Sequence, residues 1–464
     1  MLTDDILYLP VRELGSRIRK RTLSPVALAE SYLERSRQLG ARFNAWANLT
    51  PELAMEQARA AEKEIAAGHY RGPLHGVPYA LKDLVAVKGY PTTWGAPPFQ
   101  DRQFDYNAAI VDKLNAAGAV LIGKAAMIEL AGGLGYSNGQ ASLTGPARNP
   151  WNPECWTCGS SSGSGAVVSA GMVPWAIGSD TRGSIICPAT WCGISGMRPS
   201  LGRVSTNGAM AIAWSMDKLG PMARTADCCG LVLSVIAQDF HYSPAAQVKP
   251  LRIGKATNAW TRLAPGLESA IDAALKAMEK SGARVSDAAL PDGPFEDAAE
   301  LTILMEAASA FQDMVHSGSC ANLVDPLGQV NGYPSEELTA TDYLQVQRVR
   351  AILQKRIDKL FDQFDVIATA GSATAAQRLV PPPRAQNQAA APPERPTADN
   401  SQRAPDGISS LCGLPALSVL CGFNSENLPY GIQFIARAGN DHAVIDAAHK
   451  FQTLTEWHKR RPKI

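Results

Sequence analysis

The sequence predicts an α/β protein with a mixed, mostly parallel β-sheet that is covered by helices on both faces. Short apolar runs typical of buried strands alternate with longer segments in which apolar residues recur at helical spacing. This alternation is typical of βαβ units. Hydrophobic residues make up 45% and charged residues 19% of the 464 positions, which is ordinary for a globular protein with a large core.

The N-terminal half divides into a helical segment and a segment with α/β alternation. Residues 1–70 are predicted to form a helical wrap, because apolar residues keep helical spacing between positions 10 and 68 and Ser24-Pro25 is a typical helix start. Residues 71–235 are predicted to form the catalytic core. The elements expected there are a strand at 78–87, a helix at 106–118, a strand at 119–122, a small-residue helix at 164–172 and a strand at 173–179.

The C-terminal half has a less regular pattern. Residues 236–407 are predicted to be an irregular insertion, and residues 408–464 return to the core of what we expect to be a single domain over 1–464. Proline and alanine are frequent in 376–405, which is typical of a flexible loop. Such a loop is either a lid over a substrate cleft or a mobile surface loop. Strands are expected at 251–254, 283–290, 364–370, 414–421 and 430–436, and helices at 266–281, 298–314, 341–363 and 441–457.

Charge and cysteine content restrict the classes of partner. The 44 basic and 43 acidic residues give a net charge of +1, so nothing favours a nucleic acid or an anionic membrane as partner. No stretch reaches the roughly 18 apolar residues of a membrane span, and the first residues lack a signal-peptide pattern. The nine scattered cysteines predict reduced, buried thiols in a cytoplasmic protein. Cys155 and Cys158 form a lone Cys-x-x-Cys pair, from which we expect no metal site.

Two serine-rich turns and one lysine form a candidate acyl-transfer site. Ser160 and Ser161 lie in a Gly/Ser-rich turn, and Ser184 ends a second turn after an apolar run. A helix and a strand fit between the turns, so both can meet at one edge of the sheet. Such a turn can direct several backbone N–H groups at one developing negative charge.

A serine nucleophile needs a base, and none of the seven histidines adjoins a serine turn. Lys82 is the better candidate, because its strand is apolar and a desolvated lysine has a lowered pKa. An isolated lysine here would more simply pair with Asp83. Together with the two turns, Lys82 instead predicts a relay in which Lys82 acts through a bridging serine on Ser184.

The motifs around these residues resemble the amidase signature family of serine hydrolases. The match includes Gly76-Val-Pro-Tyr-Ala-Leu-Lys82-Asp83, both serine turns and Asp217-Lys-Leu-Gly-Pro-Met-Ala-Arg224. It covers roughly residues 72–227, and it resumes at Gly413-Leu-Pro-Ala-Leu-Ser418 and Pro429-Tyr-Gly-Ile-Gln433.

The resemblance implies an amidase-signature-type sheet core and a role for each matched residue. Ser184 would be the acylated nucleophile, Ser160 a bridging serine after a cis peptide bond, and Lys82 the general base and then the acid for the leaving amine. The oxyanion hole would be formed by the backbone N–H groups of Thr181, Arg182, Gly183 and Ser184. The side chains of Ser161 and Asp180 would support the site from behind these residues.

Two departures from the family pattern concern substrate recognition. Arg182 stands where the family usually has glycine. Its backbone N–H can still donate a hydrogen bond to the oxyanion if φ is negative, and we expect its guanidinium to point outward or to contact substrate. Ile186-Cys187 replaces the arginine-plus-polar pair that is frequent in glutamine-using members.

The expected function is hydrolysis of the C–N bond of aryl or alkyl amides through an acyl-enzyme, with carbamates (urethanase activity) and esters as further substrates. We expect a small-molecule substrate, no cofactor, and a monomer or homodimer. The alternatives are the glutamine-hydrolysing subunit of a tRNA amidotransferase and a catalytically silent scaffold.

Two other motifs for serine enzymes match the sequence less well. Gly159 to Gly163 also fits the Gly-x-Ser-x-Gly elbow, but a turn-like segment precedes it rather than a strand. Ser215-x-x-Lys218 fits the β-lactamase pair, but no Lys-Thr-Gly follows it.

Overall fold

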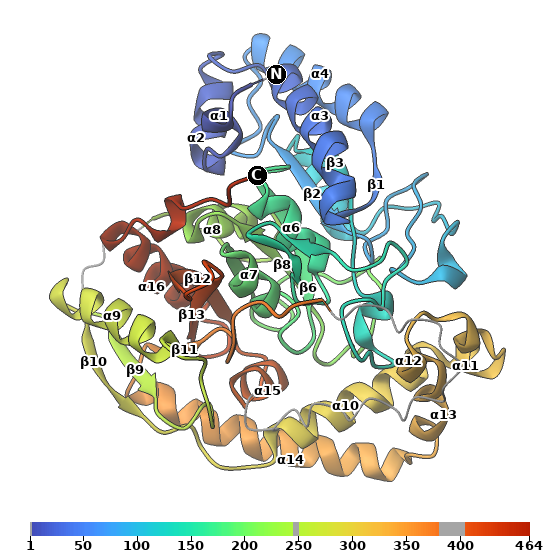
Figure 1. The fold of residues 1–464 in the computed structure, drawn as a ribbon, viewed down its shortest axis with the longest axis vertical. Coiled ribbons are helices and arrows are strands. Elements are labelled where there is room, and N and C mark those ends of the chain that lie inside the picture. Colours follow the sequence, from blue (N-terminus) through green and yellow to red (C-terminus); the bar gives the residue numbers. More distant parts are fainter. Residues whose placement is uncertain (1, 245–249, 380–403) are drawn as a thin grey trace.

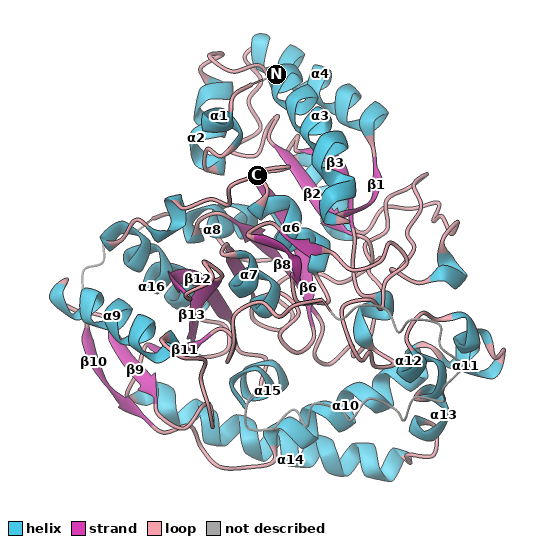
Figure 2. Ribbon diagram, viewed as in Figure 1, coloured by secondary structure: helices cyan, strands magenta, loops and turns pink. Residues whose placement is uncertain are grey.

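One large β-sheet forms the centre of the computed structural model, which describes residues 2–244, 250–379 and 404–464 (Figures 1 and 2). Its eleven strands lie in the order β1-β3-β2-β6-β8-β7-β12-β13-β11-β9-β10. Their bounds are β1 Trp46–Leu49, β2 Pro78–Lys82, β3 Val120–Ala125, β6 Trp175–Asp180, β7 Ser195–Arg198, β8 Lys218–Ala223, β9 Arg252–Ala256, β10 Arg284–Ala288, β11 Val366–Ala370, β12 Ala416–Phe423 and β13 Pro429–Ile435. The short strands β4 (Arg148–Asn149) and β5 (Asn152–Trp156) pair separately.

The sheet is mixed, as predicted, but the prediction that it is mostly parallel is wrong. Strand β2 pairs in parallel with β3 and β6, and β9 pairs in parallel with β10 and β11, whereas the remaining neighbours are antiparallel. The cause is the way the chain returns after β6. Strands β12 and β13 form an antiparallel hairpin, and β8 lies between β6 and β7 and runs antiparallel to both.

Helices cover both faces of this sheet (Figure 2). Helices α1–α4 lie at one end with β1–β3, and α10–α14 lie at the opposite end (Figure 1). Near the centre α6 packs against α7, and α8 packs against α16. The helices are α1 Asp4–Leu7, α2 Val11–Arg19, α3 Pro25–Phe43, α4 Pro51–Ala66, α5 Ala109–Ala116, α6 Ser162–Ser169, α7 Ile186–Cys192, α8 Ala226–Ile236, α9 Leu267–Lys280, α10 Phe295–Ala310, α11 Gln312–His316, α12 Pro326–Val330, α13 Gly332–Ser335, α14 Ala340–Asp358, α15 Ala404–Leu411 and α16 Asp441–Leu454. None of the helices in the described ranges combines the length and the apolar run needed to cross a bilayer.

The segment 236–407, predicted to be an irregular insertion, contains several helices and strands. Its strands β9, β10 and β11 extend the central sheet, and α10 packs against α14 and α15. The amphipathic α9 packs on β12 and β13, which attaches the segment to the core. Of the expected loop at 376–405, residues 380–403 lie outside the described residues.

Small residues let α6 approach the end of β3 closely. A Cβ atom at Gly163 would lie 2.4 Å from the carbonyl oxygen of Ala45 and 2.5 Å from the nitrogen of Ala126. Both are backbone atoms, which have little freedom to move away. The first turn of α6, and the serines that precede it, are therefore fixed against β3.

We expect Gly163→Ala to destabilise the protein by several kcal/mol, although alanine is normally the better helix former by about 1 kcal/mol. Chemical denaturation measures this loss. Gly40→Ala in α3 is the matched control, because its nearest neighbour is the movable ring of Trp46 at 3.0 Å. Equal losses in the two variants would contradict the close-approach argument.

Candidate active site

A buried lysine is the centre of the candidate site. Lys82 ends β2, which lies between β3 and β6 and is buried along its whole length. Its Nζ donates hydrogen bonds to Ser160 Oγ at 2.8 Å, Ser161 Oγ at 3.0 Å and Ser179 Oγ at 2.8 Å. An ammonium group has three protons to donate, so three hydroxyl acceptors satisfy it fully.

The three hydroxyls come from two elements. Ser160 and Ser161 lie in the turn just before α6, and the Gly159–Ser160 peptide bond is cis. Ser179 lies at the end of β6, which runs parallel to β2, so the two strands finish at the same edge of the sheet. Ser161 also binds β6, because its Oγ donates to Ser179 O and accepts from Ser179 N.

Burial determines the charge state of the lysine. Desolvation lowers the pKa of Lys82 to about 7, although Asp180 and Asp217 favour the ammonium form. Hydroxyl acceptors carry no net charge, so they do not restore the ordinary pKa of a lysine. At neutral pH a large fraction of Lys82 is therefore an amine that can accept a proton.

The simpler pairing of Lys82 with Asp83 does not occur. Asp83 instead forms a fully buried ion pair with Lys124 of β3, with 2.9 Å between Nζ and Oδ1. Its other oxygen accepts from the backbone and hydroxyl of Thr93. Adjacent strands thus carry two buried lysines, of which only Lys124 has a carboxylate at ion-pair distance in the described part of the chain.

Ser184 lies in the second turn, between β6 and α7, and is partly exposed. Its carbonyl oxygen accepts from Ser161 N at 3.3 Å, which joins the two serine turns through the backbone. Within the described ranges its hydroxyl makes no hydrogen bond to Ser160. The sequence thus predicted correctly that the turns meet, while the direct contact between the two hydroxyls is absent from this arrangement.

Asp180 fixes the shape of the second turn. Its carboxylate accepts from Gly183 N and Ile185 N, each at 2.8 Å, and from Ile186 N at 3.4 Å. Gly183 has φ +90°, a conformation that favours glycine, and a Cβ there would lie 3.0 Å from Asp406 Oδ2.

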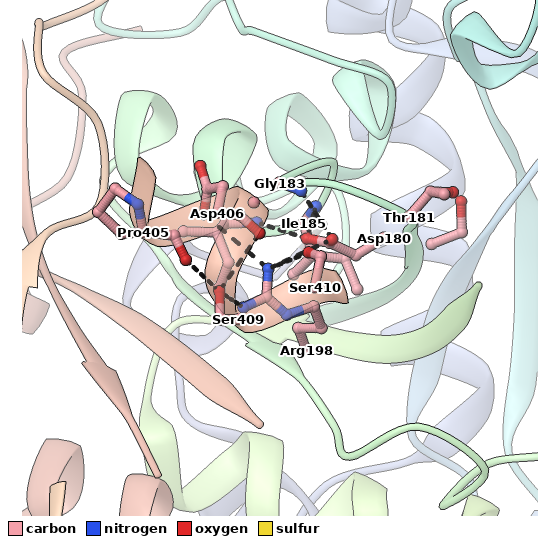
Figure 3. A network of polar contacts seen from close by, with 12 residues as sticks. Asp180, Thr181, Gly183, Ile185, Arg198, Pro405, Asp406, Ser409 and Ser410 are labelled. Carbon is pink, nitrogen blue, oxygen red and sulfur yellow. Dashed lines mark hydrogen bonds and ion pairs between the residues drawn. The ribbon is translucent and has the colours of Figure 1, made fainter. Parts of the chain in front are cut away.

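A buried arginine holds Asp180 from the other side (Figure 3). Arg198 Nη1 lies 3.5 Å from Asp180 Oδ1, and both side chains are fully buried. The guanidinium also donates to Ser409 and Ser410 of α15. Burial alone would raise the pKa of Asp180, but Arg198, Lys218 and the backbone donors outweigh it and lower the pKa, so the carboxylate stays ionised.

The turn offers three of the four backbone N–H groups expected for an oxyanion hole. The N–H of Gly183 points to Asp180 and is not available. Those of Thr181, Arg182 and Ser184 make no hydrogen bond within the described residues. Arg182 does not have a positive φ, and its guanidinium lies 3.6 Å from both Glu296 and Glu300 of α10, so it contacts the helical segment rather than pointing outward.

A cavity of about 230 Å³ lies next to this edge of the sheet. Its polar side includes Ser179, Thr181, Asp217 and Lys218, and its apolar side includes Met210, Ile212 and Trp214. Asp217 accepts from the Thr181 hydroxyl at 2.6 Å and from two backbone N–H groups, and burial raises its pKa. The described part of the chain contains no group of three or more His, Cys, Asp or Glu side chains placed to hold a metal ion.

The prediction that all cysteines are reduced is wrong for one pair. Cys158 and Cys187 form a disulfide, whereas the other seven cysteines are free and buried. The two serine turns bring their Cα atoms to 5.9 Å, within the usual range for a disulfide. No sequence pattern pairs residues that lie 29 positions apart, so only the meeting of the turns explains the bond.

Two side chains at the site were not predicted from the sequence. Ser179 contacts Lys82 directly, although the sequence indicates only that it ends the strand that leads into the second serine turn. The signal that could have found it is its position at the end of a strand parallel to that of Lys82. Lys218 is fully buried beside the cavity, and its residue pairs with Asp180 across β6 and β8. Desolvation lowers the pKa of Lys218 to about 7.

Comparisons with known proteins identify the family of this chain. The model of the Amidase family matches residues 27–445. The chain is 33% identical to a glutamyl-tRNA(Gln) amidotransferase subunit of Methylococcus capsulatus, over 97% of this chain and 98% of that protein. It is also 33% identical to the putative amidase AmiD of Mycobacterium bovis, over 99% of this chain and 97% of that protein.

The solved structures extend the likeness to the whole fold. The native peptide amidase from Stenotrophomonas maltophilia superposes with a TM-score of 0.81 at 25% sequence identity. The superposition covers 98% of this chain and 97% of the peptide amidase.

The Asp180–Arg198 pair gives a stability prediction. Asp180→Asn removes the nearer of the two carboxylates that pair with the buried Arg198, the other being Asp406 at 3.9 Å, and we expect a loss of about 3–5 kcal/mol of unfolding free energy. Urea denaturation at neutral pH measures it. Asp4→Asn is the control, because its pair with Arg35 is half exposed and is worth at most about 1 kcal/mol. A loss at Asp180 no larger than at Asp4 would show that the buried pair does not hold the turn.

Proposed function

This chain belongs to the amidase family of enzymes that act on C–N bonds, and from that premise we propose that it is a serine hydrolase in which Ser184, Ser160 and Lys82 carry out acyl transfer. The observation that carries the proposal is the contact of 2.8 Å between the buried Lys82 Nζ and Ser160 Oγ. A neutral amine in this position can remove a proton from a serine near pH 7.

In the proposed acylation step, Ser184 Oγ attacks the substrate carbonyl carbon. Its proton passes to Ser160 Oγ while the Ser160 proton passes to Lys82 Nζ. No hydrogen bond joins the two hydroxyls in the described residues, so we propose that a rotation of the partly exposed Ser184 side chain completes the relay when substrate binds. Catalytic hydrogen bonds often tighten only in the complex with substrate.

The negative charge that develops on the carbonyl oxygen needs donors that are already in place. The N–H groups of Thr181, Arg182 and Ser184 are the proposed donors, and Asp180 holds their turn rigid through Gly183 and Ile185. Removal of one such donor in other enzymes costs about 10²–10³-fold in rate.

The same groups complete the cycle. The Lys82 ammonium returns its proton through Ser160 to the leaving nitrogen, and the C–N bond breaks. A water molecule then attacks the ester on Ser184, with Lys82 again acting as the base. Ser161 and Ser179 hold the lysine in place as positioning residues.

The proposed substrates are aryl or alkyl amides, with carbamates and esters as further substrates. The cavity beside Ser179 supports this, because Met210, Ile212 and Trp214 offer an apolar wall for a hydrocarbon group. The amidase AmiD and the peptide amidase are relatives named for amide cleavage.

The second candidate is hydrolysis of glutamine as part of an amidotransferase, which the likeness to the Methylococcus capsulatus protein supports. The chain's own residues favour it less. Ile186 is fully buried and Cys187 is in a disulfide, so neither supplies a charged or amide contact at the position where glutamine-using members have a polar pair. Hydrolysis by the lone purified chain therefore separates the two candidates.

The purified chain alone should cleave an anilide and a carbamate faster than glutamine. Ser184→Ala should lose at least about 10³-fold in kcat and all labelling by a fluorophosphonate probe, and Ser160→Ala should lose about 10²–10⁴-fold. Release of the aryl amine and mass spectrometry of the labelled peptide measure these effects.

Ser162→Ala is the matched control, because Ser162 is the first residue of α6, directly after the turn, and is buried but makes no hydrogen bond to Lys82. It should retain wild-type kcat. Labelling at Ser161, or full activity of Ser184→Ala, would refute the assignment of the nucleophile.

The rate should depend on pH through Lys82. Only the neutral amine is a base, and its pKa is lowered to about 7, so kcat/KM should fall about tenfold per pH unit below that value and be constant above it. Lys82→Met should lose this dependence together with most of the activity.

Lys218 is the necessary control, because its pKa is also lowered to about 7. Lys218→Met should keep the acidic limb of the profile at the same pH, whatever its effect on the absolute rate. If the limb disappears in Lys218→Met and persists in Lys82→Met, the base has been assigned to the wrong lysine.

A further inference from the structure

The disulfide occupies a particular place in the site. Cys158 lies two residues before Ser160, and Cys187 lies three residues after Ser184. The loop of chain that the disulfide closes therefore contains both serines of the proposed relay, Ser160 and Ser184. No other cysteine in the described residues is paired.

Hydrogen bonds also join the first turn to the strand that leads into the second, because the Ser161 hydroxyl bonds to the backbone N–H and carbonyl of Ser179. Lys82 holds the first turn through Ser160 and Ser161, and Asp180 holds the second through its backbone. Between the turns, the backbone hydrogen bond from Ser161 N to Ser184 O is 3.3 Å long, toward the weak end of the range. The disulfide is thus the strongest direct connection between them.

Cys158 also has a backbone conformation that needs support. Its φ is +65°, in the left-handed region that residues with a Cβ rarely adopt. Such a conformation persists only where the surroundings enforce it. The bond to Cys187 supplies that constraint two residues before Ser160.

We infer that the Cys158–Cys187 disulfide is a redox-cleavable clamp that sets the spacing of Ser160 and Ser184, so that its reduction by a dithiol slows acyl transfer. This inference rests on the proposed function of Ser184. The clamp makes Cys158 and Cys187 positioning residues rather than participants in the reaction.

The reduction is ordinary thiol–disulfide exchange. Cys187 is partly exposed and Cys158 is buried, so a thiolate of the dithiol attacks Cys187 Sγ. The S–S bond breaks, and Cys158 leaves as a thiolate and takes up a proton. The second thiol of the reagent then displaces Cys187, so the protein gains two electrons and two protons while the dithiol becomes a disulfide.

The test compares the oxidised and the dithiothreitol-treated protein. Mass spectrometry under non-reducing conditions gives the state of the two cysteines, and the labelling rate of Ser184 by a fluorophosphonate reports the relay. We expect labelling and kcat to fall about 10- to 100-fold on reduction, with KM nearly constant, and to recover on reoxidation with glutathione disulfide. Assays well below the melting temperature of both forms exclude unfolding as the cause.

Variants separate the clamp from other effects of the reagent. Cys158→Ala/Cys187→Ala should be slow from the outset and insensitive to dithiothreitol. Cys155→Ala is the matched control, since Cys155 is a buried free cysteine of the preceding strand, and it should behave like wild type.

Three results would overturn the clamp. They are free thiols at both positions in the oxidised protein, a disulfide that folded protein keeps in the presence of dithiothreitol, and equal labelling rates in verified oxidised and reduced forms. Absence of Ser184 labelling even in the oxidised protein would instead refute the proposed function, so the two failures are distinguishable.

Discussion

The burial of one amine is the constraint on which the rest of the site depends. Lys82 can be a base near neutral pH only because β2 lies inside the sheet and removes its side chain from water. An ion pair would raise the pKa of Lys82 again, but none forms with Asp83 because Asp83 pairs with Lys124 instead. The acceptors that remain are hydroxyls, which satisfy the amine without restoring its charge.

The neighbouring carboxylate is kept in the opposite state. Asp180 is as deeply buried as Lys82, yet Arg198 and several backbone N–H groups keep it ionised. It can therefore shape the second turn while the lysine next to it remains available as a base. The two groups therefore have different roles. At Lys82 burial dominates and lowers the pKa, whereas at Asp180 the nearby positive charges and backbone donors outweigh burial and keep the carboxylate ionised.

Local patterns in the sequence predicted many of the helices and strands, but they did not predict which distant segments pair with one another. The periodicity of 10–68, the apolar strand that carries Lys82 and the two serine turns each correspond to an observed element, although the strand ends at Lys82 rather than at residue 87. Strand direction after β6 and the Cys158–Cys187 bond could not be predicted, because both depend on which segments meet after folding. Ser179 was missed because a serine at the end of a strand has no distinctive signal until its parallel neighbour is known.

The most direct test of the account is the ionisation of Lys82 itself. An NMR titration of protein with isotope-labelled lysine measures it without any substrate. The Lys82 signal is assigned by its absence from Lys82→Met, and the signals of the other two buried lysines are assigned by Lys124→Met and Lys218→Met. The account predicts that Lys82 loses its proton with a pKa of about 7. A Lys82 signal that titrates near the ordinary lysine value of about 10.4 would contradict it, because the amine would then be protonated throughout the neutral range.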